Sequence, residues 1–377
     1  MDLSLDREDF STLPGWAEDR PAAAFAAFRR SALHATQTRP YRTGSLGLGA
    51  ADFEPAYAAA LAVSESESGY PSDVEARCFF ETWFRPVEVR QDGGSGLVTG
   101  YYEPEVSVSE KPESGYRFPF LRKPENLIKV PDPDNPPGGI PAGFAFMLAG
   151  ADAMTLCPDR QAIESGAFDG LGLEIAWASS RADVFFAHVQ GCARLCFPDG
   201  RVERITYAAK SGHPFTGIGG LLVKRDEISP NLVSMAAIRD WLAANPQRAD
   251  RLMWENRSFI FFEKAAVEND YLGPVAAAKV PLEPGRSLAV DRHVHTFGTP
   301  IFVSAPGLQD FDEPRPFARL MIAQDTGTAI VGPARGDLFA GCGFAAGEKA
   351  GSIKEPARFV ILAPAGSEIA RRAGHEQ

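Results

Sequence analysis

Short apolar runs separated by long connections rich in glycine and proline constrain the fold of this chain more than any other feature. From residue 258 onward the runs are four or five residues long: Phe259–Phe262, Ser287–Val290, Ile301–Ala305, Leu320–Ala323 and Phe359–Leu362. Runs of this length bounded by turn-forming residues are typical of strands. Short strands with such connections predict a closed β-barrel of irregular topology and argue against a parallel βαβ sheet.

The remainder of the chain mixes helical and strand patterns. The first third predicts helices over Ala22–Leu33, Tyr57–Val63 and Val74–Phe84, the last with Cys78, Phe79 and Trp83 facing inward. A turn at Asp92–Gly96 precedes a strand over Leu97–Val108, and Asp132–Gly143 reads as a long loop. The middle predicts a short helix at Pro158–Gly166, strands at Asp183–Val189, Cys192–Phe197 and Val202–Ala208, and helices at Pro214–Val223 and Met235–Ala244.

Length and composition indicate an ordinary globular protein. The 377 residues suffice for two domains, and 45% apolar with 23% charged residues is typical of such chains. A formal net charge of −11 argues against a nucleic-acid partner. The chain has no apolar run of membrane-spanning length and no apolar segment typical of a signal peptide near its start. Its five cysteines do not form a disulfide framework, and Cys192 and Cys196 lack partners at zinc-binding spacing.

Three aspartates lie in glycine-rich surroundings in the last third of the chain: Asp291, Asp325 and Asp337. Each follows or joins an apolar run, so we expect each of them at a strand end, where the chain turns. Carboxylates beside glycines at strand ends can line a cleft in which a ligand approaches the backbone closely. An Asp next to a Gly is also ordinary turn chemistry. Three in one segment favour a carboxylate site, and carboxylic acids suit glycosidic bond cleavage above other reactions.

Several sequence blocks occur in a characteristic order: LVTGYYEPEV at 97–106, FFAHVQGCARL at 185–195, YAAKSGHPFTGIGG at 207–220, and then AVDRHVHTFGTPIFV, AQDTGTAIVGPARGDLFAG and GFAAGEKAG. Together they resemble the signatures of the membrane-bound lytic transglycosylase A (MltA) family of peptidoglycan-cleaving enzymes. The last three blocks are similar to the three-aspartate module of that family. The resemblance covers about two thirds of the chain, from roughly Leu97 to Leu362.

The resemblance implies a mainly β fold with helices (α+β). A double-psi β-barrel catalytic domain is then built from residues 1–105, whose N-terminal part is helical, and residues 250–377. A β-rich glycan-binding domain is inserted at residues 106–249, and a groove between the two domains holds the glycan strand.

The resemblance also implies a chemistry and a catalytic residue, Asp337, with Asp325 as its close support. In lytic transglycosylation one carboxylic acid protonates the oxygen between N-acetylmuramic acid and N-acetylglucosamine. The same group then takes the proton of the muramyl C6 hydroxyl, which closes a 1,6-anhydro ring without water. One residue acting as acid and then as base needs a pKa raised toward neutrality, which burial and a second carboxylate both favour. We expect Asp291 to support the site structurally, as a cap of backbone amides.

Further residues are expected to bind the substrate: Tyr101, Tyr102, Glu103, Gln190, Gly191, Lys210 and Gly327. The tyrosines can stack on sugar faces, but neighbouring strand residues face opposite sides, so at most one of the two lines the groove. Gln190 offers an amide to hydroxyl or N-acetyl groups, Gly191 leaves room for the sugar, and Lys210 can meet carboxylates. We interpret His213 and His293 as structural.

Two other functions stay open at this point. The same carboxylates suit a hydrolase that uses Asp325, Asp337 and water, and the fold also suits an inactive peptidoglycan-binding protein. We expect no metal and no cofactor, a monomer, glycan strands of peptidoglycan as the partner, and other cell-wall enzymes as further candidates. The expected location is the periplasm. The first cysteine is Cys78, so either a lipid anchor to the outer membrane is absent from this sequence or the protein is soluble there.

Overall fold

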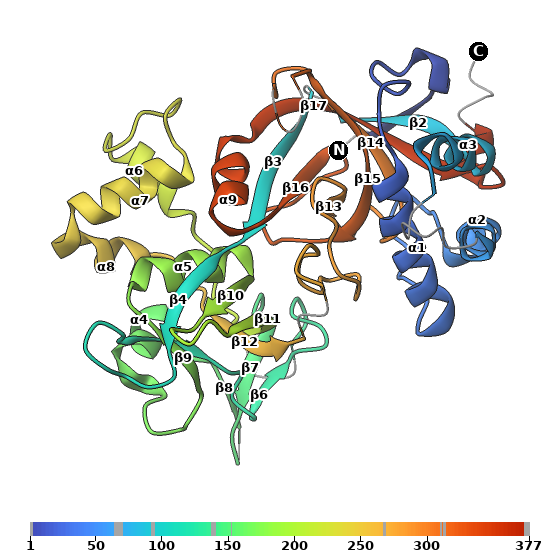
Figure 1. The fold of residues 1–377 in the computed structure, drawn as a ribbon. Coiled ribbons are helices and arrows are strands. Elements are labelled where there is room, and N and C mark those ends of the chain that lie inside the picture. The colour runs from blue at the N-terminus through green and yellow to red at the C-terminus, as the bar shows by residue number, and fades with distance from the viewer. Residues whose placement is uncertain are drawn as a thin grey trace. The chain divides into compact units, whose positions relative to one another are not determined.

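The computed structural model of the protein describes residues 3–63, 71–91, 95–136, 141–151, 153–266, 269–309, 311 and 314–372 (Figure 1). The chain forms two compact units. Unit 1 consists of Met1–Tyr102 and Asn269–Gln377, and unit 2 of Glu103–Glu268. We expected the boundaries after residues 105 and 249. The structure places the first after residue 102 and the second after residue 268, because the helix and the strand that follow residue 245 pack within unit 2.

Unit 1 is a β-barrel with helices beside it. Its sheet has the strand order β1-β2-β17-β14-β15-β13-β16-β3, and β3 also pairs with β17, which closes a ring of six strands. Strands β13 and β15 pair in parallel. The elements of unit 1 are β1 (Leu3–Arg7), the 3₁₀ helix η1 (Phe10–Thr12), α1 (Ala22–Gln37), α2 (Ala50–Ala62), α3 (Asp73–Trp83), β2 (Phe84–Gln91), β3 (Gly96–Glu103), β13 (Ser287–Val290), β14 (Pro300–Ala305), β15 (Phe317–Asp325), β16 (Arg335–Cys342), α9 (Gly343–Ser352), β17 (Lys354–Pro364) and α10 (Glu368–Arg372).

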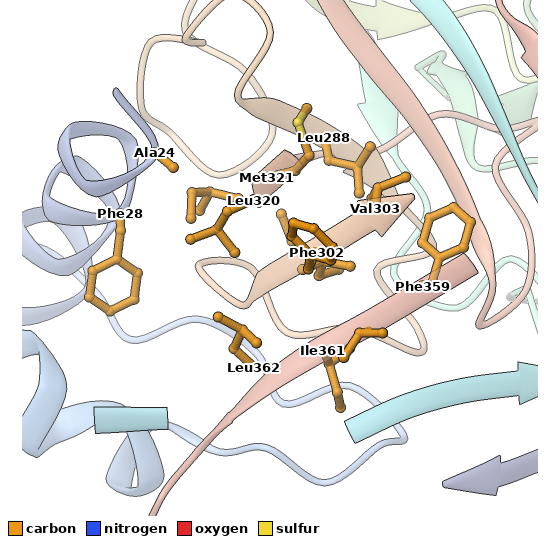
Figure 2. Packing of buried hydrophobic residues seen from close by; sticks show 14 of the residues in the cluster. Ala24, Phe28, Leu288, Phe302, Val303, Leu320, Met321, Phe359, Ile361 and Leu362 are labelled. Carbon is orange, nitrogen blue, oxygen red and sulfur yellow. The ribbon is translucent and has the colours of Figure 1, made fainter. Parts of the chain in front are cut away.

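The barrel interior and the first helices share one hydrophobic core. Phe302, Leu320 and Ile361 on three different strands are at most 1% exposed. Figure 2 shows Ala24 and Phe28 on the side of α1 that faces these strands. Burial of so much apolar surface is the main term that stabilises a closed barrel of short strands. The expectation of a mainly β fold with a double-psi barrel is confirmed.

Unit 2 is built on a six-stranded sheet with the order β12-β11-β10-β4-β9-β5 and a three-stranded sheet β6-β7-β8. Its helices pack in separate apolar clusters on this framework. The elements are β4 (Glu105–Ser109), β5 (Phe118–Leu121), β6 (Leu127–Lys129), β7 (Phe146–Ala149), β8 (Met154–Thr155), α4 (Arg160–Ala162), the π-helix η2 (Ile163–Ala167), β9 (Glu174–Ala178), α5 (Arg181–Gln190), β10 (Cys192–Cys196), β11 (Val202–Lys210), α6 (Ile218–Lys224), α7 (Met235–Ala244), α8 (Pro246–Trp254) and β12 (Ile260–Ala265).

The strand predicted at Asp183–Val189 is wrong, because this segment belongs to helix α5. The Ser180 hydroxyl caps its first turn by accepting from the Asp183 amide at 3.3 Å, and Gly191 ends it at φ 78°. The helix is buried on two sides: Val184 packs with the sheet, whereas Phe185 packs with α6, α7 and α8. A helix covered on two sides has a nearly continuous apolar run, which periodicity cannot distinguish from a buried strand.

Several other predictions need smaller corrections. The single strand expected over Leu97–Val108 is interrupted at Pro104, and its halves β3 and β4 belong to different sheets. Helix α3 fully buries Ala76 and Phe80. Of the three residues predicted to face inward, Phe79 and Trp83 are partly buried against the core, whereas Cys78 is exposed. Helix α2 begins at Ala50, before the predicted start, and α6 begins at Ile218, after its predicted start. The predicted turn at Asp92–Gly96 lies partly outside the described residues.

Candidate active site

The pairing of three strands brings Asp325 and Asp337 onto one surface of the barrel. Ala289 in the central strand β13 pairs with Asp325 of β15 on one side and with Asp337 of β16 on the other. Neighbouring strands lie about 4.8 Å apart, and residues in register project to the same face of a sheet. The two carboxyl groups therefore share a face although 11 residues lie between them in the sequence.

A bulge and a glycine establish this arrangement. Leu288 pairs with Ala323 and Ala289 with Asp325, so Gln324 is an extra residue that shifts the register by one and turns Asp325 to the face of Asp337. At Gly336 a Cβ atom would lie 2.8 Å from the Phe359 ring, so this position points into the packed barrel. Asp337, the next residue, therefore points to the opposite face. Asp325 does end its strand as expected, but Asp337 is the third residue of β16 and not a turn residue.

Asp337 has a partly exposed side chain held by β3 and by its own strand. Its Oδ1 accepts a hydrogen bond from the Thr99 hydroxyl at 2.5 Å, and the Arg335 guanidinium lies nearby. Burial raises the pKa of Asp337 from 3.8 to about 6, whereas the Thr99 hydrogen bond and the Arg335 charge lower it and the Asp325 charge raises it. A carboxyl group with this pKa exists in both protonation states near neutral pH.

Asp325 is held by three donors. Its Oδ2 accepts from the Tyr101 hydroxyl at 3.0 Å, and its Oδ1 accepts from the Ala277 amide at 3.2 Å. Burial raises the pKa of Asp325, while the amides of Thr326 and Ala277 and the hydroxyl of Tyr101 lower it. These bonds orient the carboxyl group and favour its charged form relative to a buried carboxyl without donors.

The side chains of Tyr101 and Tyr102 lie on opposite faces of β3, as the alternation of strand residues predicts. Tyr101 lies on the aspartate face, where its ring centroid is 5.3 Å from that of Phe339. Tyr102 lies on the other face under α9, where a Cβ added to Gly347 would come within 2.8 Å of its ring. Tyr101 and Phe339 form a small apolar cluster with Leu282 and Ala289, next to the carboxyl groups. This cluster gives the site an apolar floor, which contributes to the desolvation of both aspartates.

Asp291 follows β13 directly and binds backbone amides. Its Oδ1 accepts from the His293 amide at 2.9 Å, and its Oδ2 accepts from the Gly332 amide at 2.8 Å. This is the capping geometry expected for a supporting residue. His295 does not share this role: its Nε2 lies 2.8 Å from the Pro333 carbonyl oxygen.

Glu103, which we expected to contact substrate, is instead enclosed in unit 2. Its side chain is fully buried, and both carboxylate oxygens are engaged by arginines. Arg204 donates to Oε1 at 2.7 Å and to Oε2 at 2.9 Å, and Arg194 donates to Oε2 at 2.9 Å. A buried carboxylate needs such partners to remain charged, so Glu103 is held by β10 and β11 within unit 2 and is not available to a ligand.

The other predicted binding residues lie on the two units separately. In unit 2, Gln190 ends α5, Gly191 has no atom within 4 Å of an added Cβ, and Lys210 is the last residue of β11. Gln190 and Lys210 are both partly exposed. Gly327 in unit 1 is exposed two residues after Asp325. His213 is buried in unit 2 with its Nε2 2.7 Å from the Cys157 carbonyl, as a structural histidine would be.

Thr99, Arg335 and Ala277 surround the aspartates but were not singled out from the sequence. Thr99 had a usable signal, because it lies two residues before Tyr101 and therefore on the same face of β3. Arg335 could have been found in the same way, because it lies two residues before Asp337 and therefore on the same face of β16. Ala277 contributes a backbone amide, for which a sequence pattern offers no signal.

Neither a metal cluster nor a membrane-spanning helix occurs in the part of the chain that the structure describes. Among those residues, no group of three or more His, Cys, Asp or Glu side chains is arranged to hold a metal ion. The five cysteines all lie among these residues, and none of them is joined in a disulfide. Within the same described ranges, no helix combines the length and apolarity needed to cross a bilayer.

Two family models match the chain. The MltA specific insert domain matches residues 97–263, and the 3D domain matches residues 286–363. The first lies mostly in unit 2 and includes β3 from its second residue onward, and the second contains all three aspartates.

Known proteins resemble the chain over much of its length. A crystal structure of a membrane-bound lytic murein transglycosylase from Agrobacterium tumefaciens is 48% identical with a TM-score of 0.90, covering 98% of this chain and 99% of that one. Membrane-bound lytic murein transglycosylase A of Vibrio cholerae is 33% identical over 267 residues, which are 69% of this chain and 63% of that protein. A structure of Escherichia coli MltA with bound chitohexaose is 24% identical with a TM-score of 0.67, covers 97% of this chain and 95% of its own, and shows likeness of fold.

Proposed function

This chain belongs to the membrane-bound lytic murein transglycosylase A (MltA) family, and from that premise we propose that it is a peptidoglycan lytic transglycosylase. It cleaves the β-1,4 bond between N-acetylmuramic acid and N-acetylglucosamine and forms a 1,6-anhydromuramyl product. The observation that carries the proposal is the pair Asp325 and Asp337, which share one face of the barrel, with a pKa of about 6 for Asp337.

Asp337 acts first as the acid. Its proton moves to the glycosidic oxygen, and the electron pair of the breaking C1–O bond leaves with that oxygen. Positive charge then develops at C1 and the ring oxygen of the muramyl residue. Asp325, whose carboxylate is oriented by Tyr101 and Ala277, stabilises this charge electrostatically.

Asp337 acts next as the base. Its carboxylate takes the proton of the muramyl C6 hydroxyl, and the C6 oxygen forms the new bond to C1. The proton returns to Asp337, so the acid is regenerated without water. A pKa of about 6 suits both halves of this cycle, because neither protonation state is strongly disfavoured near neutral pH. The C6 attack also gains from proximity, since the nucleophile belongs to the same sugar.

Unit 2 supplies the second part of the proposal. Gln190, Gly191 and Lys210 bind the glycan, with the amide of Gln190 hydrogen-bonded to sugar hydroxyl or N-acetyl groups. Their partial exposure and the open space beside Gly191 support this role. The chitohexaose bound to the E. coli relative supports glycan strands as the ligand class. The location that agrees with the names of the relatives is the periplasm, in association with the outer membrane.

Digestion of purified peptidoglycan in ¹⁸O-labelled water tests the proposal. We expect 1,6-anhydromuramyl ends, one water lighter than reducing ends, with no label at C1. Labelled reducing ends would refute the transglycosylase and support the hydrolase that uses Asp325, Asp337 and water. Glycan binding without any cleavage would instead support a binding protein.

A further inference from the structure

Three side chains on the aspartate face form a chain of hydrogen bonds that the mechanism above does not use. Arg335 Nη2 lies 2.7 Å from the Thr99 hydroxyl oxygen, and that hydroxyl lies 2.5 Å from Oδ1 of Asp337. Arg335 and Asp337 are two residues apart on β16, and Thr99 comes from β3, which neighbours β16 in the barrel. All three belong to unit 1.

The chemistry of the groups fixes the direction of these bonds when Asp337 is ionised, because a carboxylate only accepts. A guanidinium group has five N–H donors and no acceptor, so Arg335 must donate and Thr99 must accept. A hydroxyl group has a single proton, which is therefore free to point at Asp337. Thr99 donates to Oδ1 and leaves Oδ2 as the oxygen that carries the proton when Asp337 is in its acid form.

We propose that Arg335 is a positioning residue for Asp337, acting through Thr99 to keep the proton on Oδ2 in the acid step and to direct it back to Oδ2 in the base step. This inference deepens the proposed function and rests on it. In the first step the O–H bond at Oδ2 breaks as the proton joins the leaving oxygen. In the second step the C6 hydroxyl proton forms a new bond to the same Oδ2.

The charges around Asp337 agree with such a role. Arg335 on β16 and the Thr99 hydroxyl on β3 lower the pKa of Asp337, whereas Asp325 on β15 raises it. The other titratable neighbour on β3, Tyr101, donates to Asp325. Arg335 and Thr99 therefore offset part of the rise caused by burial and keep the carboxylate accessible as a base.

Arg335 also has contacts with the backbone, so loss of activity alone would not identify its role. Its Nη1 donates to the Gly336 carbonyl and lies 3.5 Å from the Leu97 carbonyl. A structural role predicts loss of stability after substitution. The positioning role predicts, in addition, a change in the pKa of Asp337 that depends on the Thr99 hydroxyl.

The test is a double-mutant cycle with Arg335→Met and Thr99→Val, followed by carboxyl ¹³C NMR titration of Asp337 in the folded protein without substrate. We expect each single substitution to raise the pKa of Asp337 above its value of about 6. We expect each to lower kcat by roughly 10–100-fold, the loss typical of a slightly misplaced group, with little change in KM. In the Thr99→Val background, Arg335→Met should add much less to either effect than it does in the wild type.

Conservative variants and a charge control complete the design. Thr99→Ser keeps the hydroxyl and should restore both the pKa and kcat. Arg335→Lys keeps the charge without the planar fork, so its kcat should lie between those of the wild type and Arg335→Met. Arg319→Met on β15 removes one positive charge from the same barrel and should leave the pKa of Asp337 unchanged.

Several outcomes would overturn the positioning role: equal effects of Arg335→Met in both backgrounds, no rescue by Thr99→Ser, or wild-type behaviour of Arg335→Lys. If Arg335→Met does not fold, Arg335→Lys and Thr99→Ser still give two of these results. Because the titration needs no substrate, its outcome is independent of the product analysis that tests the transglycosylase activity.

Discussion

The raised pKa of Asp337 makes the folded protein less stable at neutral pH, and replacing this residue should reveal the effect. The ordinary pKa of an aspartate is 3.8 and that of Asp337 in the folded state is about 6. Between these values the folded state binds more protons than the unfolded state, so the free energy of unfolding decreases as the pH rises. The penalty is absent below pH 3.8 and complete above about pH 6.

The size of the penalty follows from the difference of about 2.2 between the two pKa values. At 1.36 kcal/mol for each pKa unit, the upper limit is about 3 kcal/mol. The Asp337 side chain keeps some access to solvent, so we expect roughly 1–3 kcal/mol. In a unit of this size such a gain raises the Tm by about 2–4 °C per kcal/mol.

Asp337→Asn removes the penalty and keeps an oxygen that accepts from Thr99. We therefore expect a higher Tm than that of the wild type at pH 8 and nearly equal values at pH 4, measured by calorimetry. Activity should fall by more than the 10²–10⁴-fold typical of one general acid, since acid and base are lost together. Asp240→Asn, at an exposed position of α7, is the matched control and should show no pH-dependent gain. A Tm difference that is the same at both pH values would contradict the stability penalty from the Asp337 charge, and substantial activity in the folded variant would contradict its catalytic role.

Three further substitutions test other parts of the structure. Asp325→Asn removes a charge that raises the pKa of Asp337, so activity should decrease and the pH optimum should move downward; an upward shift would contradict this role. Gln190→Ala should weaken chitooligosaccharide binding by roughly 0.5–1.5 kcal/mol in an inactive background, as measured by calorimetry, and unchanged affinity would remove Gln190 from the site. Burial raises the pKa of Glu88, but hydrogen bonds from arginines, including Arg358, hold it at about 2. Glu88→Gln should therefore destabilise the barrel by roughly 1.5–3 kcal/mol at pH 7. The Tm difference from the wild type should shrink as the pH falls below 4.5 toward 2.

Most of the strands and the family were predictable because they depend on local patterns. The runs at Ser287–Val290 and Ile301–Ala305 became β13 and β14 with little change, and Met235–Ala244 became α7 with the same bounds. The errors occurred where tertiary packing overrides such patterns. Helix α5 read as a strand because it is covered on two sides, and the segment around Asp337 read as a turn because Gly336 fits a crowded position inside the barrel.

The residues of the candidate site were likewise only partly predictable from the sequence. Residue type and spacing in the sequence were enough to single out Asp291, Asp325 and Asp337, and to separate the faces of Tyr101 and Tyr102. The same reasoning wrongly predicted that Glu103 contacts the substrate. The arginines that enclose it, Arg194 and Arg204, lie about 90 to 100 residues away in the sequence, so no local pattern indicates them.

Residue identity and short-range order are enough to predict which strands can form, which carboxylic acids are available and to which family the chain belongs. The pKa values of these carboxylic acids, in contrast, depend on contacts between residues that are far apart in the sequence. The Thr99 hydroxyl meets Asp337 across 238 residues of sequence, and Ala289 pairs with both aspartates because a bulge at Gln324 shifts the register. A pKa depends on burial and on donors that strand pairing brings within a few ångströms, and those distances exist only in the folded barrel.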